Sequence, residues 1–373
     1  MIFISIALIL LVLGVYDVFS ENKAQKEKIL KGIIIILIIF LGTRGFLGWD
    51  WYFYYPSFMN STYIYEKGYM LYTSLIRGFF RNYIFYQLIT TTIDFIALYF
   101  IFKKYCKYPI MAFAIFFSIQ GLHIEVELLR NIKAMILFLF SIQYIKERKI
   151  APFLILNILG ILFHTSAVFY LPMYFILNYN YKNKIIMGIF ILGSIYYLLD
   201  LKIFHLIFKL NFEYLPKILE NKLINYRDVV PKDLIRGLNL FYLERALIFF
   251  LAYKYEKDVI IKNSAYIWIS IFLFTSELSI VSLRIGILFI YGAWLVLTRA
   301  IENVKNKKIL VIIICLLCFV RIYKSMMFPG NKINYKYENA IFNKLNYEKR
   351  EKELIESKKY LKESHGKELL IQY

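Results

Sequence analysis

The chain of 373 residues has only three cysteines and four histidines, and no group of Cys, His or acidic residues has the spacing of a metal site. Cys315 and Cys318 form a CxxC pair. It has no second pair and lies inside the apolar run 309–320, which suits two small apolar fillers. Acidic residues are also few, 26 against 46 Lys and Arg. We expect no metal and no other cofactor.

The resulting net charge of +20 does not indicate a nucleic-acid partner, because most Lys and Arg residues stand in short loops beside hydrophobic runs, as topology signals do. The abundant residues are apolar: 60% are hydrophobic and 19% aromatic, against roughly 45–50% apolar residues in soluble domains. The apolar runs are about 15–20 residues long, whereas outer-membrane strands would alternate over about 10 residues. The sequence predicts an all-α, polytopic integral membrane protein.

The apolar segments predict about 10–12 transmembrane helices. The N-terminal segment lacks a basic start and a cleavage site, which indicates a retained first helix. The later segments are 32–43, 84–102, 109–122, 128–145, 151–178, 185–201, 239–253, 264–278, 281–298 and 309–323. Segment 151–178 is too long for one upright helix and too short for two full spans, which predicts a broken or re-entrant hairpin.

The basic loops set the expected orientation. They are 21–31, 103–107, 146–149, 254–262 and 299–308. Lys and Arg favour the cytoplasmic side, so the long loops 45–83 and 202–236 lie outside. If segment 151–178 crossed only once, loop 202–236 would lie inside instead. Residues 1–323 are then a single transmembrane domain. Residues 324–373 are a charged tail with almost no apolar face, typical of a solvated helix or a disordered end.

Several cationic side chains lie within these segments or at their ends, where a buried guanidinium needs a partner or a watery cavity. They are Arg44, Arg130, His164, Arg245, Arg284 and Arg321. In the expected orientation they converge on the outer leaflet, in a cationic cavity open to the exterior. Arg321 is expected to snorkel to the headgroups.

Other polar and aromatic residues have plainer expected roles. Asp94 is expected to make an interhelical hydrogen bond. His123, Glu125 and Glu127 resemble a solvated outer turn that could pair with Arg130. The aromatic residues of loop 45–83 suit stacking on sugar rings, or simply the aromatic belt of a membrane protein.

Three motifs follow one another along the chain. The first holds Arg44, Gly48, Asp50, Trp51 and Tyr54, then Glu66, Gly68 and Tyr69; the second holds Leu129, Arg130 and Ala134; the third holds Phe163, His164, Ser166, Ala167, Leu171, Pro172 and Tyr174. With a late arginine, Arg284, this pattern resembles the EpsG-type polysaccharide polymerases, a branch of the Wzy-like O-antigen polymerases. Two positions depart from it: Asn131 stands for a usual Gln, and Lys67 for a common Pro.

The resemblance implies a bacterial glycosyltransferase of the cytoplasmic membrane whose active site faces outward. It would join oligosaccharide repeat units carried on undecaprenyl diphosphate, which serve as both donor and acceptor, into an O-antigen, a capsule or an exopolysaccharide. Membrane lipids, a flippase and a chain-length regulator are the further partners that it implies. The arginines would take the place of a metal as counter-charge to the diphosphate.

The chemistry of this transfer assigns candidate roles. Arg130, Arg284, Arg245 and Arg44 would bind the departing diphosphate. His164, Glu66 or Asp50 would accept the proton of the attacking hydroxyl. Tyr54, Tyr69, Trp51 and Asn131 would contact the sugars.

Two other classes of protein remain open. An O-antigen ligase-like enzyme or a membrane acyltransferase would share such a cavity. A glycan flippase or transporter would show internal repeats and charges spread over both leaflets, and the sequence has no such repeat.

Overall fold

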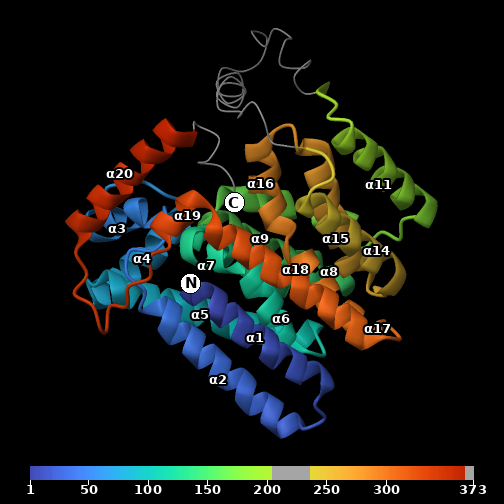
Figure 1. Cartoon of the computed structure of the whole chain (residues 1–373), viewed down its shortest axis with the longest axis horizontal. Coiled ribbons are helices and arrows are strands. Elements are labelled where there is room, and N and C mark those ends of the chain that lie inside the picture. The colour runs from blue at the N-terminus through green and yellow to red at the C-terminus, as the bar shows by residue number, and fades with distance from the viewer. Residues whose placement is uncertain (204–235, 366–373) are drawn as a thin grey trace.

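The computed structural model describes residues 1–203 and 236–365, and within these ranges every regular element is a helix (Figure 1). The helices are α1 (Ile2–Phe19), α2 (Lys23–Gly42), α3 (Trp51–Asn60), α4 (Lys67–Phe79), α5 (Tyr83–Tyr105), α6 (Pro109–Phe116), η1 (Phe117–Gly121), α7 (Leu122–Glu127), α8 (Leu129–Lys146), α9 (Ile150–Phe163), η2 (Thr165–Tyr170), α10 (Met173–Ile176), α11 (Asn183–Leu198), α14 (Leu240–Tyr255), α15 (Val259–Thr275), α16 (Ser279–Phe289), α17 (Tyr291–Asn303), α18 (Lys307–Met327), α19 (Pro329–Asn334) and α20 (Tyr347–His365).

Four helical stretches of the described chain are long and apolar enough to cross a membrane. They are Ile2–Phe19, Tyr83–Tyr105, Pro109–Glu127 and Lys307–Met327. Ser282–Phe289 and Tyr291–Asn303, bent by 43°, would make a fifth span. Shorter apolar helices accompany them: Ile150–Phe163, Thr165–Ile176, Asn183–Leu198 and Val259–Thr275. The chain is an all-α polytopic membrane protein. The number of ten to twelve spans stays a prediction.

The expected break in segment 151–178 falls at His164. Its backbone is extended (φ −153°, ψ 122°) between α9 and η2, which pack against each other. Asn178 donates to the carbonyl oxygen of Ile145 at 3.0 Å, so the end of the segment lies near its beginning. The segment is therefore a hairpin, and His164 stands at its tip.

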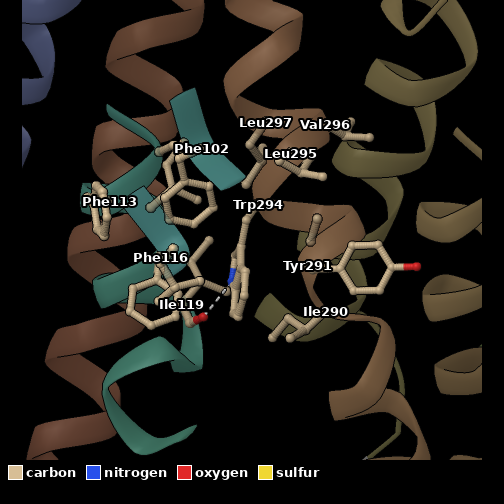
Figure 2. Close-up of a cluster of buried hydrophobic side chains, with 14 of the residues drawn as sticks. Phe102, Phe113, Phe116, Ile119, Ile290, Tyr291, Trp294, Leu295, Val296 and Leu297 are labelled. Carbon is tan, nitrogen blue, oxygen red and sulfur yellow. Dashed lines mark hydrogen bonds between the residues drawn. The ribbon is translucent and has the colours of Figure 1, made fainter. Parts of the chain in front are cut away.

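A second break interrupts the span 109–127 and is held by a tryptophan. Ile119 (φ −111°, ψ 83°) and Gln120 (φ 63°, ψ −12°) leave the helical conformation in η1. Such a kink frees backbone groups from the helix. The indole Nε1 of Trp294 donates to the freed carbonyl of Ile119 at 2.9 Å, within the aromatic core around Phe116 (Figure 2).

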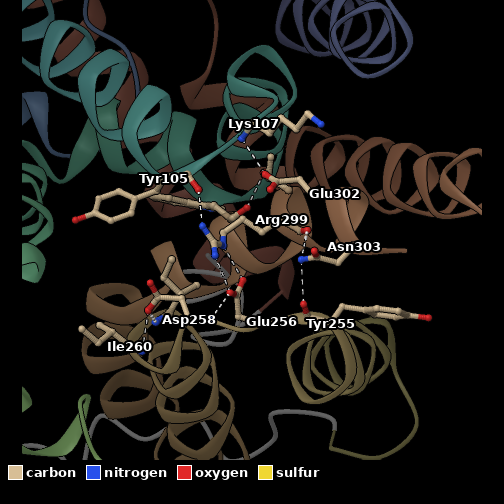
Figure 3. A network of polar contacts seen from close by, with 12 residues as sticks. Tyr105, Lys107, Tyr255, Glu256, Asp258, Ile260, Arg299, Glu302 and Asn303 are labelled. Atoms are coloured by element: carbon tan, nitrogen blue, oxygen red, sulfur yellow. Dashed lines mark hydrogen bonds and ion pairs between the residues drawn. The ribbon is translucent and has the colours of Figure 1, made fainter. Parts of the chain in front are cut away.

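Away from the tip of the α9–η2 hairpin, a polar network joins the end of α17 to the ends of α5 and α14 and the loops that follow these two helices (Figure 3). Arg299 binds both carboxylate oxygens of Glu256, at 2.8 and 2.9 Å, and donates to the carbonyl of Tyr105 at 2.9 Å. The backbone N–H of Lys107 donates to Glu302 at 2.8 Å. Bidentate pairs of this kind fix geometry as well as charge. These contacts tie together helices that are distant in sequence.

Within the C-terminal tail, Tyr347–His365 form helix α20, and part of this helix is not solvated as expected. Helix α20 lies beside α3 (Figure 1), where Tyr347 stacks on Tyr55 with ring centroids 4.6 Å apart. Leu354 is fully buried, and Arg350 donates to the backbone oxygens of Phe46 and Asn334, at 3.1 and 3.0 Å. A few anchoring side chains dock this helix, although its sequence has almost no continuous apolar face.

Candidate functional site

Two glycines of the 45–83 segment let the backbone approach its neighbours closely. Gly48 has a φ of +80°, and a Cβ there would lie 2.7 Å from Oε1 of Glu127. A Cβ on Gly68 would lie 2.7 Å from the side chain and 2.8 Å from the carbonyl oxygen of Leu162. Gly68 therefore allows α4 to pack tightly on the last turn of α9, which brings Glu66 to the tip of the hairpin.

Glu66 and Arg130 form the centre of the site. Nη1 of Arg130 lies 2.6 Å from Oε2 of Glu66, and its guanidinium lies 4.5 Å from the ring centroid of Tyr65. The other carboxylate oxygen of Glu66 accepts the backbone N–H of Thr165 at 3.0 Å. Burial acts to raise the pKa of Glu66, but Thr165 and Arg130 outweigh it, so this pKa falls below its usual value. Both carboxylate oxygens of Glu66 thus accept hydrogen bonds.

His164 is held by the turn that it begins. Its Nδ1 lies 2.5 Å from Oγ of Ser166 and accepts the backbone N–H of Ser166 at 3.2 Å. The hydroxyl oxygen of Ser166 also lies 3.3 Å from Oδ1 of Asn131. The amide that stands in place of the usual Gln thus orients the histidine turn. None of the described residues hydrogen-bonds Nε2 of His164.

Asp50 and Arg284 complete the site. Asp50 stands at the N-terminus of α3 and does not cap it, and none of the described residues hydrogen-bonds its carboxylate. Burial raises the pKa of Asp50 to about 6, against the charges of Arg130, Arg284 and Lys358. Arg284 is exposed on α16 and makes no hydrogen bond or ion pair within the described ranges. It lies close enough to act electrostatically on Asp50 and on His164.

The site thus joins residues of the 45–83 segment, α8, the α9–η2 tip and α16. The sequence model of the EpsG family matches residues 29–339, which include all of them. The chain belongs to the EpsG family. This is a bacterial family of polysaccharide polymerases, which suggests a glycosyltransferase-type enzyme acting on a lipid-linked oligosaccharide. No curated protein and no solved structure matches the chain.

Arg44, the first residue of the EpsG-type pattern, lies outside this cluster. It is 1% exposed, and its guanidinium donates to the carbonyls of Leu41 and Glu125, at 2.5 and 3.2 Å, and to Thr91 at 3.2 Å. These contacts tie α2 to α5 and α7. Since the side chain is enclosed and engaged, we leave Arg44 out of the diphosphate site.

The acidic residues near Arg44 are buried, which corrects the solvated turn expected at 123–127. His123, Glu125 and Glu127 are at most 6% exposed. Glu125 accepts a hydrogen bond from Thr91 at 2.8 Å, and Glu127 accepts one from Tyr335 at 2.6 Å. The turn is covered by residues that follow α18, which local sequence does not reveal. Asp94 makes the expected interhelical contact, as an ion pair with Lys133 of α8.

Arg245 also lies apart from the site, and Arg321 does not snorkel. Arg245 pairs with Glu244 at 2.5 Å, and Arg321 lies 3.5 Å from the same carboxylate. No hydrogen bond, ion pair or ring contact among the described residues joins this group to Asp50, Glu66 or His164. Neither arginine is therefore part of the cluster around Glu66.

The expected sugar-contacting aromatic residues are mostly enclosed. Trp51 and Tyr69 are each 2% exposed and pack in an aromatic cluster, and the hydroxyl of Tyr69 lies 2.6 Å from that of Tyr86. Tyr54 is buried too, with its hydroxyl 3.5 Å from Nε of Arg130. Because their faces are covered, we leave Trp51 and Tyr69 out of the sugar site and assign Tyr54 to the support of Arg130.

Three residues of the site were not predicted. Tyr65 stacks on Arg130, Thr165 binds Glu66, and Lys358 acts on Asp50 from α20. Tyr65 and Thr165 stand directly beside the motif residues Glu66 and His164, so the motifs could have indicated them. Lys358 follows 308 residues after Asp50, and nothing in the tail sequence indicates it.

Within residues 1–203 and 236–365, no group of three His, Cys, Asp or Glu residues could hold a metal ion. The loop 202–236, which the sequence places on the outer side, lies almost entirely outside the described residues.

Proposed function

We propose that this protein is a polysaccharide polymerase that joins oligosaccharide repeat units carried on undecaprenyl diphosphate. One observation carries the proposal: Asp50, Glu66, Arg130, His164 and Arg284 come from four parts of the chain and gather at one place. The group combines two carboxylates, an imidazole and two guanidiniums, which are the acid–base and anion-binding groups that glycosyl transfer from a diphosphate needs.

Arg284 is our candidate for binding the diphosphate of the donor. Its exposed guanidinium has no partner among the described residues, whereas Arg130 is engaged with Glu66. A planar guanidinium binds phosphate oxygens in a bidentate manner and stays charged at any physiological pH. Arg284 can therefore stabilise the negative charge that develops on the leaving group.

Asp50 is our candidate for the base, ahead of His164 and Glu66. A base works best when its pKa lies near the working pH, and the pKa of Asp50 is about 6 whereas that of Glu66 is lowered. Its carboxylate has no hydrogen-bond partner among the described residues, so it is available to a hydroxyl. We assign His164 to orienting the sugar hydroxyl through Nε2, and Glu66 to positioning Arg130.

The proposed reaction is a single displacement at the donor sugar. The acceptor hydroxyl oxygen forms a bond to the anomeric carbon, and the bond from that carbon to the diphosphate oxygen breaks. The hydroxyl proton passes to Asp50. Undecaprenyl diphosphate leaves with the bonding electron pair beside Arg284.

We further propose that the site faces the exterior of the cytoplasmic membrane. The basic loops at 103–107, 146–149 and 299–308 support this orientation, because Lys and Arg favour the cytoplasmic side. The repeat units would then reach the site after a flippase has exported them, and a chain-length regulator would act beside it.

The test replaces the chromosomal gene with variants and reads the length of the surface glycan on gels. Arg284→Ala and Asp50→Asn are expected to leave single repeat units at the surface and no polymer. Arg81→Ala is the matched control, because Arg81 is an exposed arginine at the α4–α5 connection, outside the cluster. It is expected to give polymer of normal length.

Two results would contradict the proposal. Full-length polymer from both variants would remove the site, and lipid-linked repeat units accumulating inside the cell would indicate export instead of polymerisation.

A further inference from the structure

A second group of charges lies buried between α14 and α18, and the cluster around Glu66 does not use it. Glu244 is 1% exposed, and it is shared by two guanidiniums, with Nη1 of Arg245 at 2.5 Å and Nε of Arg321 at 3.5 Å. We call these three residues the α14–α18 trio. It carries one more positive than negative charge.

The trio has unused hydrogen-bond donors. The Nε atoms of Arg245 and Arg321 are enclosed and hydrogen-bond none of the described residues; that of Arg321 faces Glu244 at 3.5 Å without forming a hydrogen bond. Aromatic rings wall the pair: the guanidinium of Arg245 lies 4.3 Å from the ring centroids of both Trp268 and Phe272, and that of Arg321 lies 4.7 Å from the ring of Phe241. The ring faces attract the guanidinium charges, but they do not accept a strong hydrogen bond from the N–H groups.

A buried excess cation with free donors calls for an anion. A charge inside a membrane protein is costly unless it is paired, and the single carboxylate of Glu244 neutralises only one of the two arginines. The side chains of Arg245 and Arg321 keep 8% and 9% of their surface exposed, so the enclosure of the trio is not complete. The missing partner has the chemistry of a phosphate, which takes several guanidinium hydrogen bonds at once.

The surroundings favour a phosphate carried by a lipid over a free ion. Arg321 lies six residues from the end of the span Lys307–Met327, or about 9 Å at 1.5 Å per residue. Phe249 stands one turn beyond Arg245 on α14 and lines an apolar cavity of about 270 Å³ between α11, α14 and α15. A polar head at the trio therefore has an apolar cavity nearby for its chain.

We propose that the α14–α18 trio binds the phosphate head of a second membrane lipid, and that this lipid is the undecaprenyl diphosphate of the acceptor. The second part rests on the proposed function, because each transfer then needs two lipid-linked substrates at once. Arg284 would serve the donor, and Arg245 with Arg321 would hold the acceptor by its diphosphate.

The test counts the lipids bound to the purified full-length protein by native mass spectrometry, with undecaprenyl diphosphate as the probe. The wild-type protein is expected to bind two molecules. Arg321→Gln is expected to weaken one site about tenfold, the size of one lost charge-assisted hydrogen bond. Arg284→Gln weakens the other site, and Arg81→Gln, the matched control, weakens neither. Arg245 still pairs with Glu244 in the Arg321→Gln variant, so the fold should survive.

Glu244→Gln separates binding from a purely structural role. Removing the carboxylate leaves both arginines without their shared partner, so the probe should bind about tenfold more tightly. A residue that served only the fold would not improve binding. Equal affinity of wild-type and Arg321→Gln proteins, or weaker binding by Glu244→Gln, would overturn the proposal.

Competition identifies the source of the phosphate. If phosphatidylglycerol leaves the probe in place at the trio, the acceptor assignment stands. If it displaces the probe at equal concentration, the trio is a general phospholipid site and the acceptor assignment is wrong. These binding results do not depend on polymer formation, so they can fail or succeed separately from the proposed function.

Discussion

Asp50→Asn is expected to stabilise the protein while it abolishes polymer formation. The carboxyl of Asp50 has a pKa of about 6 in the folded chain, against an ordinary value of 3.8, because it is largely buried and accepts no hydrogen bond from the described residues. Ionisation of Asp50 therefore opposes folding. We propose that the native protein tolerates this cost because Asp50 acts as the base, which requires an ionised carboxylate with no hydrogen bond from the described residues.

The pKa values give the size of the effect and its dependence on pH. Because the pKa of Asp50 is raised in the folded state, the free energy of unfolding falls as the pH rises through the window from 3.8 to about 6. The loss is about 1.6 kcal/mol at pH 5 and has reached about 3 kcal/mol at pH 7.5, above the window. Asparagine does not ionise, so the variant should gain these amounts, and the gain should be smaller at pH 5.

Thermal unfolding in detergent, followed by intrinsic fluorescence, measures the gain as a difference in Tm between variant and wild type at the two pH values. Surface glycan length in the complemented strain reports activity. A Tm for Asp50→Asn below that of the wild type at pH 7.5 would refute the reasoning, and so would a gain that grows as the pH falls.

Two further variants test how the site is assembled. Gly68→Ala should destabilise the protein by about 2 kcal/mol and shorten the polymer, because its Cβ would meet a backbone oxygen of α9 at 2.8 Å. Gly78→Ala is the control: Gly78 is in the same helix, and a Cβ there would meet no atom within 4 Å, so this variant should not lower the Tm. Lys358→Ala removes a cation that lowers the pKa of Asp50, so the acid limb of polymerase activity should move to higher pH. Lys352→Ala, an exposed lysine of the same helix, should leave the limb in place, and an equal shift in both variants would contradict the assignment.

Much of the helical architecture could be predicted from the sequence, because a backbone in lipid must satisfy its own hydrogen bonds and apolar runs therefore become helices. The hairpin at 151–178 followed from its length together with the positive charge of the later loops 254–262 and 299–308. Its tip at His164 brings the third motif to the first, as the expected orientation, with both motifs on the outer side, had predicted.

The partners of the embedded charges could not be predicted. Arg130 pairs with Glu66, 64 positions earlier, and Arg321 meets Glu244, 77 positions earlier. Pairing depends on which helix faces touch, and sequence spacing does not determine that between distant helices. Arg44 shows the reverse case, since its motif position indicated the site and its contacts place it elsewhere.

The sequence by itself determined the class of the protein, the residue types of the site and the family pattern that they form. Only the tertiary structure decided which candidates lie together, that Glu66 is hydrogen-bonded whereas none of the described residues hydrogen-bonds Asp50, and that α20 brings Lys358 near Asp50. The physical reason is that composition and periodicity act locally along the chain. The energy of a buried charge depends instead on neighbours that come from distant parts of it.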